Sequence, residues 1–224
     1  MFHHIHPYTP FNLENATKLI VGTLPPPRFT TRELLPEDVD FCYGSKNGML
    51  WPILDKIFDL NLVYENSSRA IEQRRDFLIE KKIGICDIVA SAKREKIDAS
   101  DLGMQDVKLR DLIGLLQKHP QIDTLLFTGG NSKNGPEYFF RRQAKIKNIA
   151  LKTVSSEVPR IYQFKLPETK DHPVRIVKTI SLTAPSGAAN RAIGSMAKYK
   201  KERNANPKFN TMDFRIMQYT PFFN

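Results

Sequence analysis

Residues 174–194 read VRIVKTISLTAPSGAANRAIG and combine three structural signals in one stretch. The run as far as Leu182 is apolar and β-branched, which predicts a buried strand. Pro185, Ser186 and Gly187 predict a tight turn, and the alanine-rich segment after them is typical of the start of a helix. The stretch contains no histidine, cysteine or carboxylate. Backbone amides at such a turn, directly before a helix, are suited to hold a phosphate group.

Strand signals recur along the chain and alternate with helical stretches. Short apolar runs lie at residues 18–22, 83–89 and 123–130, and a further strand is expected from Ile149. Helical stretches are predicted at residues 68–82, 109–116 and 136–147. Alternation at this spacing predicts the α/β class: a three-layer α/β/α sandwich with a central, mainly parallel sheet of about four or five strands.

The 224 residues, 41% of them hydrophobic, are expected to form a single domain over residues 1–224. Residues 1–15 form a lead-in arm in this interpretation. Residues 205–224 form an aromatic tail that either packs on the domain or offers a partner surface. Two cysteines, Cys42 and Cys86, are too few for a disulfide framework or an iron–sulfur cluster. The sequence shows no signal peptide or membrane-spanning stretch, so a cytoplasmic protein is expected.

The charge balance favours a polyanionic partner. The chain has 34 Lys and Arg against 24 Asp and Glu, a formal net charge of +10. Such an excess attracts nucleic acid, the commonest soluble polyanion, although a basic protein without such a partner is an equally good reading of charge alone.

The carboxyl ends of parallel strands are the expected ligand site of such a sheet. Four loops meet there, after Gly22, Cys86, Phe127 and Leu182. The second loop begins with Asp87, whose carboxylate either caps the next turn or faces the site. The same loop is basic, which favours phosphate contacts, at Lys93, Arg94 and Lys96.

The segment FCYGSKNGMLWPIL, residues 41–54, has two interpretations. Asn47 and Gly48 form a strong turn signal before a helix that bears the only tryptophan, Trp51. In the structural interpretation Asn47 caps that helix and the aromatics belong to the core. In the functional interpretation the Asn47 amide faces a ligand.

The segment AANRAIGSMAKYKKER, residues 188–203, predicts one helix with a strongly basic composition. It is either a solvated helix face or a clamp for a DNA backbone, and the phosphate-ready turn just before it favours the clamp. Its cations, which face only Glu202, are Arg191, Lys198, Lys200, Lys201 and Arg203.

Several other chemistries lack the necessary residues. His3, His4 and His6 resemble a metal tract, but they lie in a terminus expected to be mobile, without matching ligands elsewhere, so no metal is predicted. No G-x-S-x-G nucleophile elbow is present. His119 and His172 stand next to prolines in loops and are interpreted as structural.

Taken in order, these motifs resemble the uracil-DNA glycosylase superfamily, most closely its hypoxanthine (deoxyinosine) glycosylase branch. The similarity extends from His6 to about Arg203. It rests on the order and spacing of the motifs along the chain. The matching segments are HPYTPF, LIVGTLP, YGSKNGMLWPIL, IGICDIVASAKREKIDASDL, LLFTGG and APSGAAN.

The resemblance implies a role for each candidate site residue. Asn47 would orient the attacking water and Ser186 would grip the phosphate beside the flipped nucleotide, and these two form the catalytic set. The residues implied to bind the base are Thr23, Tyr43, Thr128 and Asn131. The residues implied to bind DNA are Pro185, Gly187, Ala188, Asn190, Arg191, Lys198, Lys200 and Lys201.

The sequence departs from the family pattern at three places. Leu24 stands where many members carry an Asp or Asn that positions water. Asn47 lies four residues before Trp51, where three are expected, so an ungapped match would fall on Gly48. Thr128 replaces an asparagine that often reads the base.

The leading hypothesis is a monofunctional DNA glycosylase of base excision repair. It would flip out a deaminated base, uracil and/or hypoxanthine, and hydrolyse its N-glycosidic bond with an Asn-oriented water. No metal, cofactor or lyase activity is expected, and the protein would act as a monomer on DNA, in the cytoplasm at the nucleoid. Two alternatives stay open: a non-catalytic DNA-binding relative, and an α/β protein for a small phosphorylated ligand.

Overall fold

The computed structural model describes all of residues 1–224. The strands are β1 Phe2–Ile5, β2 Lys18–Val21, β3 Ile83–Ile85, β4 Val89–Arg94, β5 Gln105–Leu109, β6 Thr124–Phe127, β7 Lys152–Ser155, β8 Arg160–Leu166 and β9 Arg175–Ser181. The helices are α1 Pro27–Thr31, α2 Leu50–Phe58, α3 Ser68–Glu80, α4 Leu112–Lys118, α5 Pro136–Ile146, α6 Asn190–Ser195, α7 Ala197–Ala205 and α8 Thr211–Phe223. Two single 3₁₀ turns, η1 Asp101–Gly103 and η2 Gly187–Ala189, complete the elements. None of the helices has the length and apolar character needed to cross a lipid bilayer.

The central sheet has six strands in the order β3-β2-β6-β9-β8-β7. The first four are mutually parallel, so their carboxyl ends meet at one edge. The strands β8 and β7 are antiparallel additions. The prediction of four or five strands missed β8, because RIYQFKL mixes polar and apolar residues and buries only Phe164 and Leu166.

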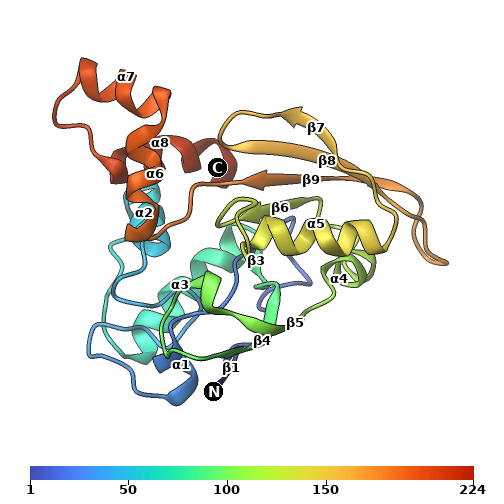
Figure 1. Ribbon diagram of the computed structural model, residues 1–224, viewed down its shortest axis with the longest axis horizontal. Helices are drawn as coiled ribbons and strands as arrows, with labels where there is room; N and C mark the ends of the chain where they lie inside the picture. The colour runs from blue at the N-terminus through green and yellow to red at the C-terminus, as the bar shows by residue number, and fades with distance from the viewer.

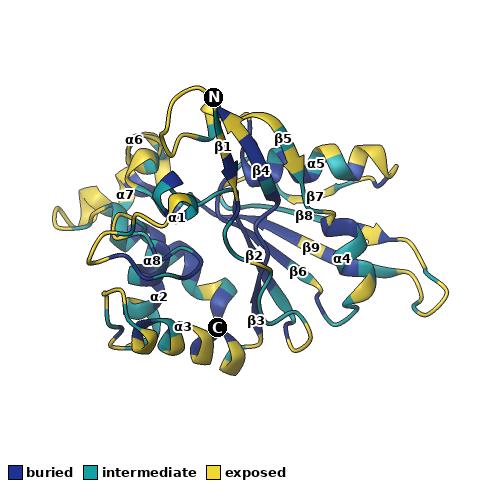
Figure 2. Ribbon diagram, turned by 90° about the horizontal axis from the view of Figure 1, so that it is seen from below, coloured by how far each residue is buried: buried dark blue, intermediate teal, exposed yellow.

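The sheet separates two hydrophobic cores. On one face α4 and α5 cover alternate residues of β2 and β6, including Leu19, Leu125 and Phe127. On the other face α2, α3 and α8 cover the intervening residues, including Ile20 and Leu126. Figure 2 shows the two groups of helices on opposite sides of the strands. Strands buried on both faces read as continuous apolar runs, which explains why the sequence revealed them.

The amino-terminal arm is built into the fold, contrary to the expectation of a mobile terminus. Residues 2–5 form β1, which pairs antiparallel with β4 in a second sheet of order β1-β4-β5. His4 is fully buried there, with Nδ1 accepting from Nε of Arg94 at 2.8 Å. The basic loop predicted around Lys93 and Arg94 is therefore a strand, and Arg94 is buried where a phosphate contact was expected.

The single helix predicted over residues 188–203 is also wrong. The chain forms η2, α6 and α7, with extended backbone at Met196 (ψ 133°) between the last two. The two helices project from one corner of the molecule (Figure 1). After them α8 begins at a capping box formed by Asn210 and Asp213 and buries Phe214, Tyr219 and Phe223 against the domain.

Candidate functional site

A cavity of about 350 Å³ lies where the parallel strands end. Its walls come from the loops after β2, β3, β6 and β9, the four loops that the topology brings to one edge. Residues 42–49 close one side, and Ala99 and Asp101 of the segment before β5 also line it. His6 and Tyr8 reach it from the amino-terminal arm.

Asp87 lies in the wall of this cavity with its carboxylate fully engaged. Its Oδ1 accepts from the amide of Gly22 at 2.7 Å and from the hydroxyl of Tyr43 at 2.8 Å. Its Oδ2 lies 2.9 Å from Nε2 of His6. Three donors from three separate segments compensate the buried charge of this carboxylate.

The hydrogen bonds of His6 fix its tautomer. The amide of Tyr8 donates to Nδ1 at 3.2 Å, so Nδ1 carries no proton. The ring proton therefore sits on Nε2 and is donated to Asp87. His6 is buried, and this arrangement holds its imidazole against the Asp87 carboxylate in the wall of the cavity.

Gly22 allows the hydrogen bonds around Asp87 to form, because a side chain at this position would overlap the groups that make them. A Cβ atom at this position would contact the Tyr43 hydroxyl and lie 2.9 Å from Oγ1 of Thr128 and 3.0 Å from Oδ1 of Asp87. The glycine after β2 is therefore required for the close approach of β2 to Asp87.

The hydroxyls of Tyr43 and Thr128 form their hydrogen bonds with other groups of the protein. Oγ1 of Thr128 donates to the carbonyl of Val21 at 3.3 Å and lies 3.2 Å from the hydroxyl of Tyr43. Burial, together with the neighbouring Asp87 charge, raises the pKa of Tyr43 well above its ordinary value. Tyr43 thus presents a neutral aromatic ring to the cavity.

The loop that contains Asn47 pairs with the turn that contains Ser186. Gly48 and Ser186 form an antiparallel bridge, and the amide of Met49 donates to the carbonyl of Pro185 at 2.9 Å. Asn47 does not cap the following helix, because α2 begins after Met49. Its side-chain amide forms no hydrogen bond with the protein, and Asn47 and Ser186 line the same cavity.

A buried carboxylate anchors the Asn47 loop from behind. Asp38 accepts two hydrogen bonds from Arg28, at 2.6 and 2.8 Å, and one from the amide of Lys46 at 2.8 Å. Burial alone would raise the pKa of Asp38, but Arg28 and the amides of Lys46 and Leu35 outweigh it and lower the pKa. The second nitrogen of Arg28 also donates to Oγ of Ser45. The loop is therefore tied down at Ser45 and Lys46.

The turn after β9 is held by α8, the tail whose role the sequence did not explain. Arg215 is fully buried and donates to the carbonyls of Ala184 at 3.0 Å and Ser186 at 2.7 Å. It also donates to Oδ1 of Asn190 at 2.9 Å. One helix turn further, Tyr219 donates to the carbonyl of Thr183 at 2.8 Å. The tail therefore fixes the shape of the turn.

The structure brings half of the predicted site residues together. Those that line the cavity are Thr23, Tyr43, Asn47, Thr128, Pro185, Ser186 and Gly187. Those that lie outside its lining are Asn131, Ala188, Asn190, Arg191, Lys198, Lys200 and Lys201. Asn131 is exposed in the loop after β6, outside the lining of the cavity. Asn190 is tied instead to Arg215.

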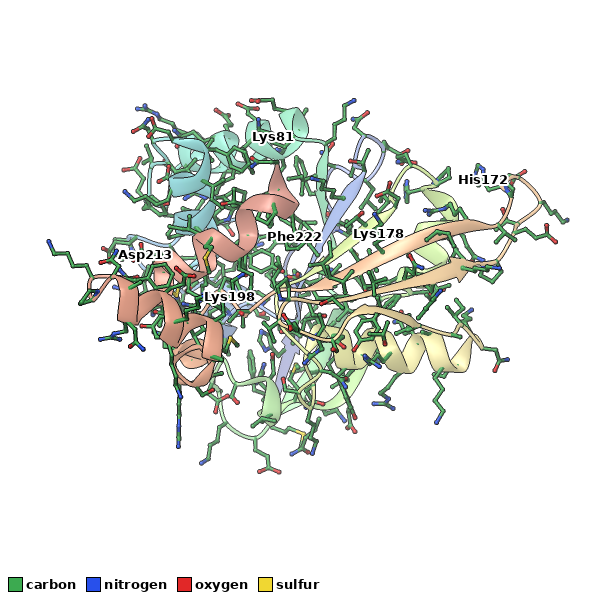
Figure 3. The ribbon with its side chains drawn as sticks, turned by 90° about the horizontal axis from the view of Figure 1, so that it is seen from above. Lys81, His172, Lys178, Lys198, Asp213 and Phe222 are labelled. Carbon is green, nitrogen blue, oxygen red and sulfur yellow. The ribbon has the colours of Figure 1, made fainter.

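The predicted DNA-binding cations are free of competing charges. Arg191 on α6 and Lys198, Lys200 and Lys201 on α7 are exposed, and no carboxylate forms an ion pair with them. Figure 3 shows Lys198 at the opposite end of the molecule from His172, which lies in the loop between β8 and β9.

His6, Asp87 and Asp101 were not among the predicted site residues. Asp87 had a signal, its place directly after a strand, and His6 belongs to the HPYTPF segment, but neither signal revealed that the two side chains meet. Asp101 accepts from the hydroxyl of Thr23 at 2.8 Å. No group of three or more His, Cys, Asp or Glu side chains is arranged to hold a metal ion.

Comparisons with known proteins support the fold and go no further. No protein-family model and no curated protein sequence matches the chain. The solution NMR structure of a Methanosarcina acetivorans protein named "putative Uracil DNA glycosylase" is similar, with a TM-score of 0.51 and 16% sequence identity. The match covers 95% of this chain and 98% of that one. The two chains share a fold over nearly their whole lengths.

Proposed function

We propose that this protein is a monofunctional DNA glycosylase that hydrolyses the N-glycosidic bond of a deaminated base, uracil and/or hypoxanthine. The observation that carries the proposal is the pairing of Gly48 with Ser186, which brings Asn47 and Ser186 to one cavity at the carboxyl edge of the sheet. A cavity of about 350 Å³ lies in the usual range for small-molecule sites and suits a single extruded base.

The chemistry needs few titrating groups. Breaking the bond leaves positive charge on the sugar and negative charge on the departing base, and a water must attack C1′. The Asn47 side chain has an amide oxygen that accepts from water without changing its charge, and no protein group competes for it. The ring of Tyr43 offers a neutral surface for the base.

The DNA contacts would lie around the mouth of the cavity. Gly187 and Ala188 are exposed, and in this proposal they enter the space left by the flipped nucleotide. Ser186 has a hydroxyl that caps no helix and is available for the neighbouring phosphate. The cations of α6 and α7 would add salt-dependent affinity for the backbone.

The test is strand cleavage after mild alkali, which breaks DNA at abasic sites. Oligonucleotides would carry one uracil, hypoxanthine or xanthine, and the proteins would be wild type, Asn47→Ala and Asn131→Ala. Cleavage by wild type and Asn131→Ala that is lost in Asn47→Ala is the expected result. Asn131→Ala is the matched control because Asn131 is exposed and outside the cavity lining. Equal cleavage by all three proteins would remove Asn47 from the mechanism.

A non-catalytic DNA-binding protein of the same fold is the second candidate. The observation in its favour is that Asn47 is exposed and lies one position further from Trp51 than the family pattern has it. In that case neither wild type nor Asn47→Ala releases any base, while both are retained on DNA in a salt-sensitive manner.

A further inference from the structure

Asp101 is a second carboxyl group in the cavity wall, held in place by three different segments. Its Oδ1 accepts from the hydroxyl of Thr23 at 2.8 Å. The amide of the Asn134 side chain donates to the carbonyls of Asp101 and Met104, at 2.9 and 3.1 Å, which pins η1 to the loop after β6. Arg94 of β4 donates to the carbonyl of Ser100. The carboxyl group is therefore positioned, and it borders the cavity.

The two carboxyl groups of the cavity have opposite surroundings. Asp87 accepts from three donors, which come from His6, Gly22 and Tyr43. Asp101 accepts from one neutral hydroxyl and forms no ion pair. The guanidinium of Arg94 donates to His4 and to the carbonyl of Ser100 and lies 3.6 Å from the carboxylate of Asp98. Paired carboxyl groups in unlike environments are the usual arrangement of an acid and an anion in one site.

Burial is the main influence on the protonation of Asp101. Burial raises the pKa of Asp101 to about 6, and the Asp87 charge adds to this. The hydroxyl of Thr23 and the charge of Arg94 act in the opposite direction and are outweighed. A carboxyl group that titrates near neutral pH holds a proton often enough to transfer it.

We propose that Asp101 is the general acid that protonates the departing base, an inference that rests on the proposed glycosylase function. In this step the C1′–N bond breaks and its electron pair goes to the base, while the carboxyl proton moves to a nitrogen or oxygen of that base. The oxygen of the attacking water forms the new bond to C1′. The proton that this water loses returns to the Asp101 carboxylate through solvent, so the base leaves neutral and the enzyme is regenerated.

Hypoxanthine and uracil depend to different degrees on a proton from Asp101. A purine such as hypoxanthine accepts the proton on its imidazole nitrogen N7, whereas uracil spreads its developing negative charge over two carbonyl groups and depends less on the transferred proton. Loss of the Asp101 proton therefore slows the release of hypoxanthine more than the release of uracil.

The test is the pH dependence of the single-turnover rate for hypoxanthine and uracil oligonucleotides, with wild type, Asp101→Asn and Thr23→Val. For wild type, hypoxanthine release is expected to fall about tenfold per pH unit above the pKa of Asp101. Asp101→Asn keeps the shape but cannot transfer a proton, so its rate is about 100-fold lower near pH 6 and independent of pH. Thr23→Val removes the donor to the ionised form, so the midpoint moves to higher pH.

Thermal melting shows whether Asp101→Asn is folded. If it is not, the midpoint of the Thr23→Val profile tests the role of Asp101 independently. Wild-type rates and an unchanged pH profile in Asp101→Asn, or an unmoved midpoint in Thr23→Val, would overturn the assignment of Asp101 alone. Base release by wild type with such a result leaves the proposed function standing. If wild type releases neither base at any pH, the proposed function fails and the role of Asp101 fails with it.

Discussion

Gly187 stands at the exposed tip of the turn after β9, where the protein itself gives no reason for a glycine. Its φ is not positive, and no atom lies within 4 Å of the position that a Cβ would take. Gly22, in contrast, is required by the side chains packed around it. The open space at Gly187 is consistent with the close approach of a ligand backbone, which is the role proposed for this tip.

Gly187→Val is expected to weaken binding of DNA at least tenfold, because a branched side chain fills the space that the DNA would occupy. The thermal midpoint should change little, since nothing in the protein is displaced. Fluorescence anisotropy with a labelled oligonucleotide measures the affinity. Gly194→Val is the control, as that position also has open space around it but lies outside the cavity. Undiminished affinity in Gly187→Val would place the DNA elsewhere.

At the scale of elements, α8 is the support of the turn after β9. Arg215 has no carboxylate partner, and its charge is compensated by carbonyl and amide oxygens of that turn and of its own helix. Such a contact orders a loop whose own residues offer few apolar contacts. An aromatic tail therefore matters to the site although it contributes no side chain to the cavity lining.

Arg215→Met is expected to lower the free energy of unfolding by about 2–4 kcal/mol, because buried acceptors are left without donors. Urea denaturation measures this change. Arg191→Met, an exposed arginine on neighbouring α6, is the control and should change stability by no more than about 0.5 kcal/mol. Equal stability of the two variants would show that Arg215 does not hold the turn.

Helix α7 carries the charge that the proposed DNA contact needs. Replacing Lys198, Lys200 and Lys201 with Ala should reduce the slope of log affinity against log salt by about 0.9 for each lysine that touches a phosphate. The triple replacement of Lys145, Lys147 and Lys152 removes the same charge from α5, the residue after it and β7. Affinity measured from 50 to 200 mM salt separates the two. Identical slopes in both triple variants would contradict a specific role for α7.

For the whole molecule, acid stability depends on the buried amino-terminal strand. Burial, with the neighbouring charge of Arg94, lowers the pKa of His4 from 6.5 to about 4. The unfolded chain therefore takes up a proton at a higher pH than the native protein. Stability from this group is fully present above pH 6.5 and is lost as the pH falls from 6.5 toward 4.

Wild type should thus lose about 1–2 kcal/mol of this stability between pH 7 and pH 5, through the titration of His4 alone. His4→Gln keeps an oxygen that can accept from Arg94 but does not titrate, so its loss over the same range should be smaller by that amount. Urea unfolding at the two pH values, with exposed His3→Gln as the control, measures the difference. Parallel losses in all three proteins would rule out His4 as the cause.

The class of fold could be predicted because buried parallel strands and amphipathic helices have recognisable hydrophobic patterns within short stretches of sequence. The runs at 18–22 and 123–130 are apolar on both faces, and the helical stretches predicted at 68–82 and 136–147 correspond to α3 and α5. The stretch predicted at 109–116 is helical only from Leu112, because Leu109 ends β5. The strands of the second sheet and β8 could not be predicted in the same way. Their sequences, such as FHHI of β1 and QDVKL of β5, contain no continuous apolar run, and pairing with distant strands is what stabilises them.

The sequence by itself determined the parallel α/β sheet, the loops at its carboxyl edge and the basic character of residues 188–203, because each depends on the spacing of side chains along a short stretch. Only the tertiary structure decided which side chains meet. His6 and Asp87 are 81 residues apart, and Arg215 lies 29 residues from the Ser186 carbonyl that it holds. Contacts over such separations depend on how the loops and the carboxyl-terminal tail fold back on the sheet. Hydrophobic periodicity within a short stretch does not predict that packing.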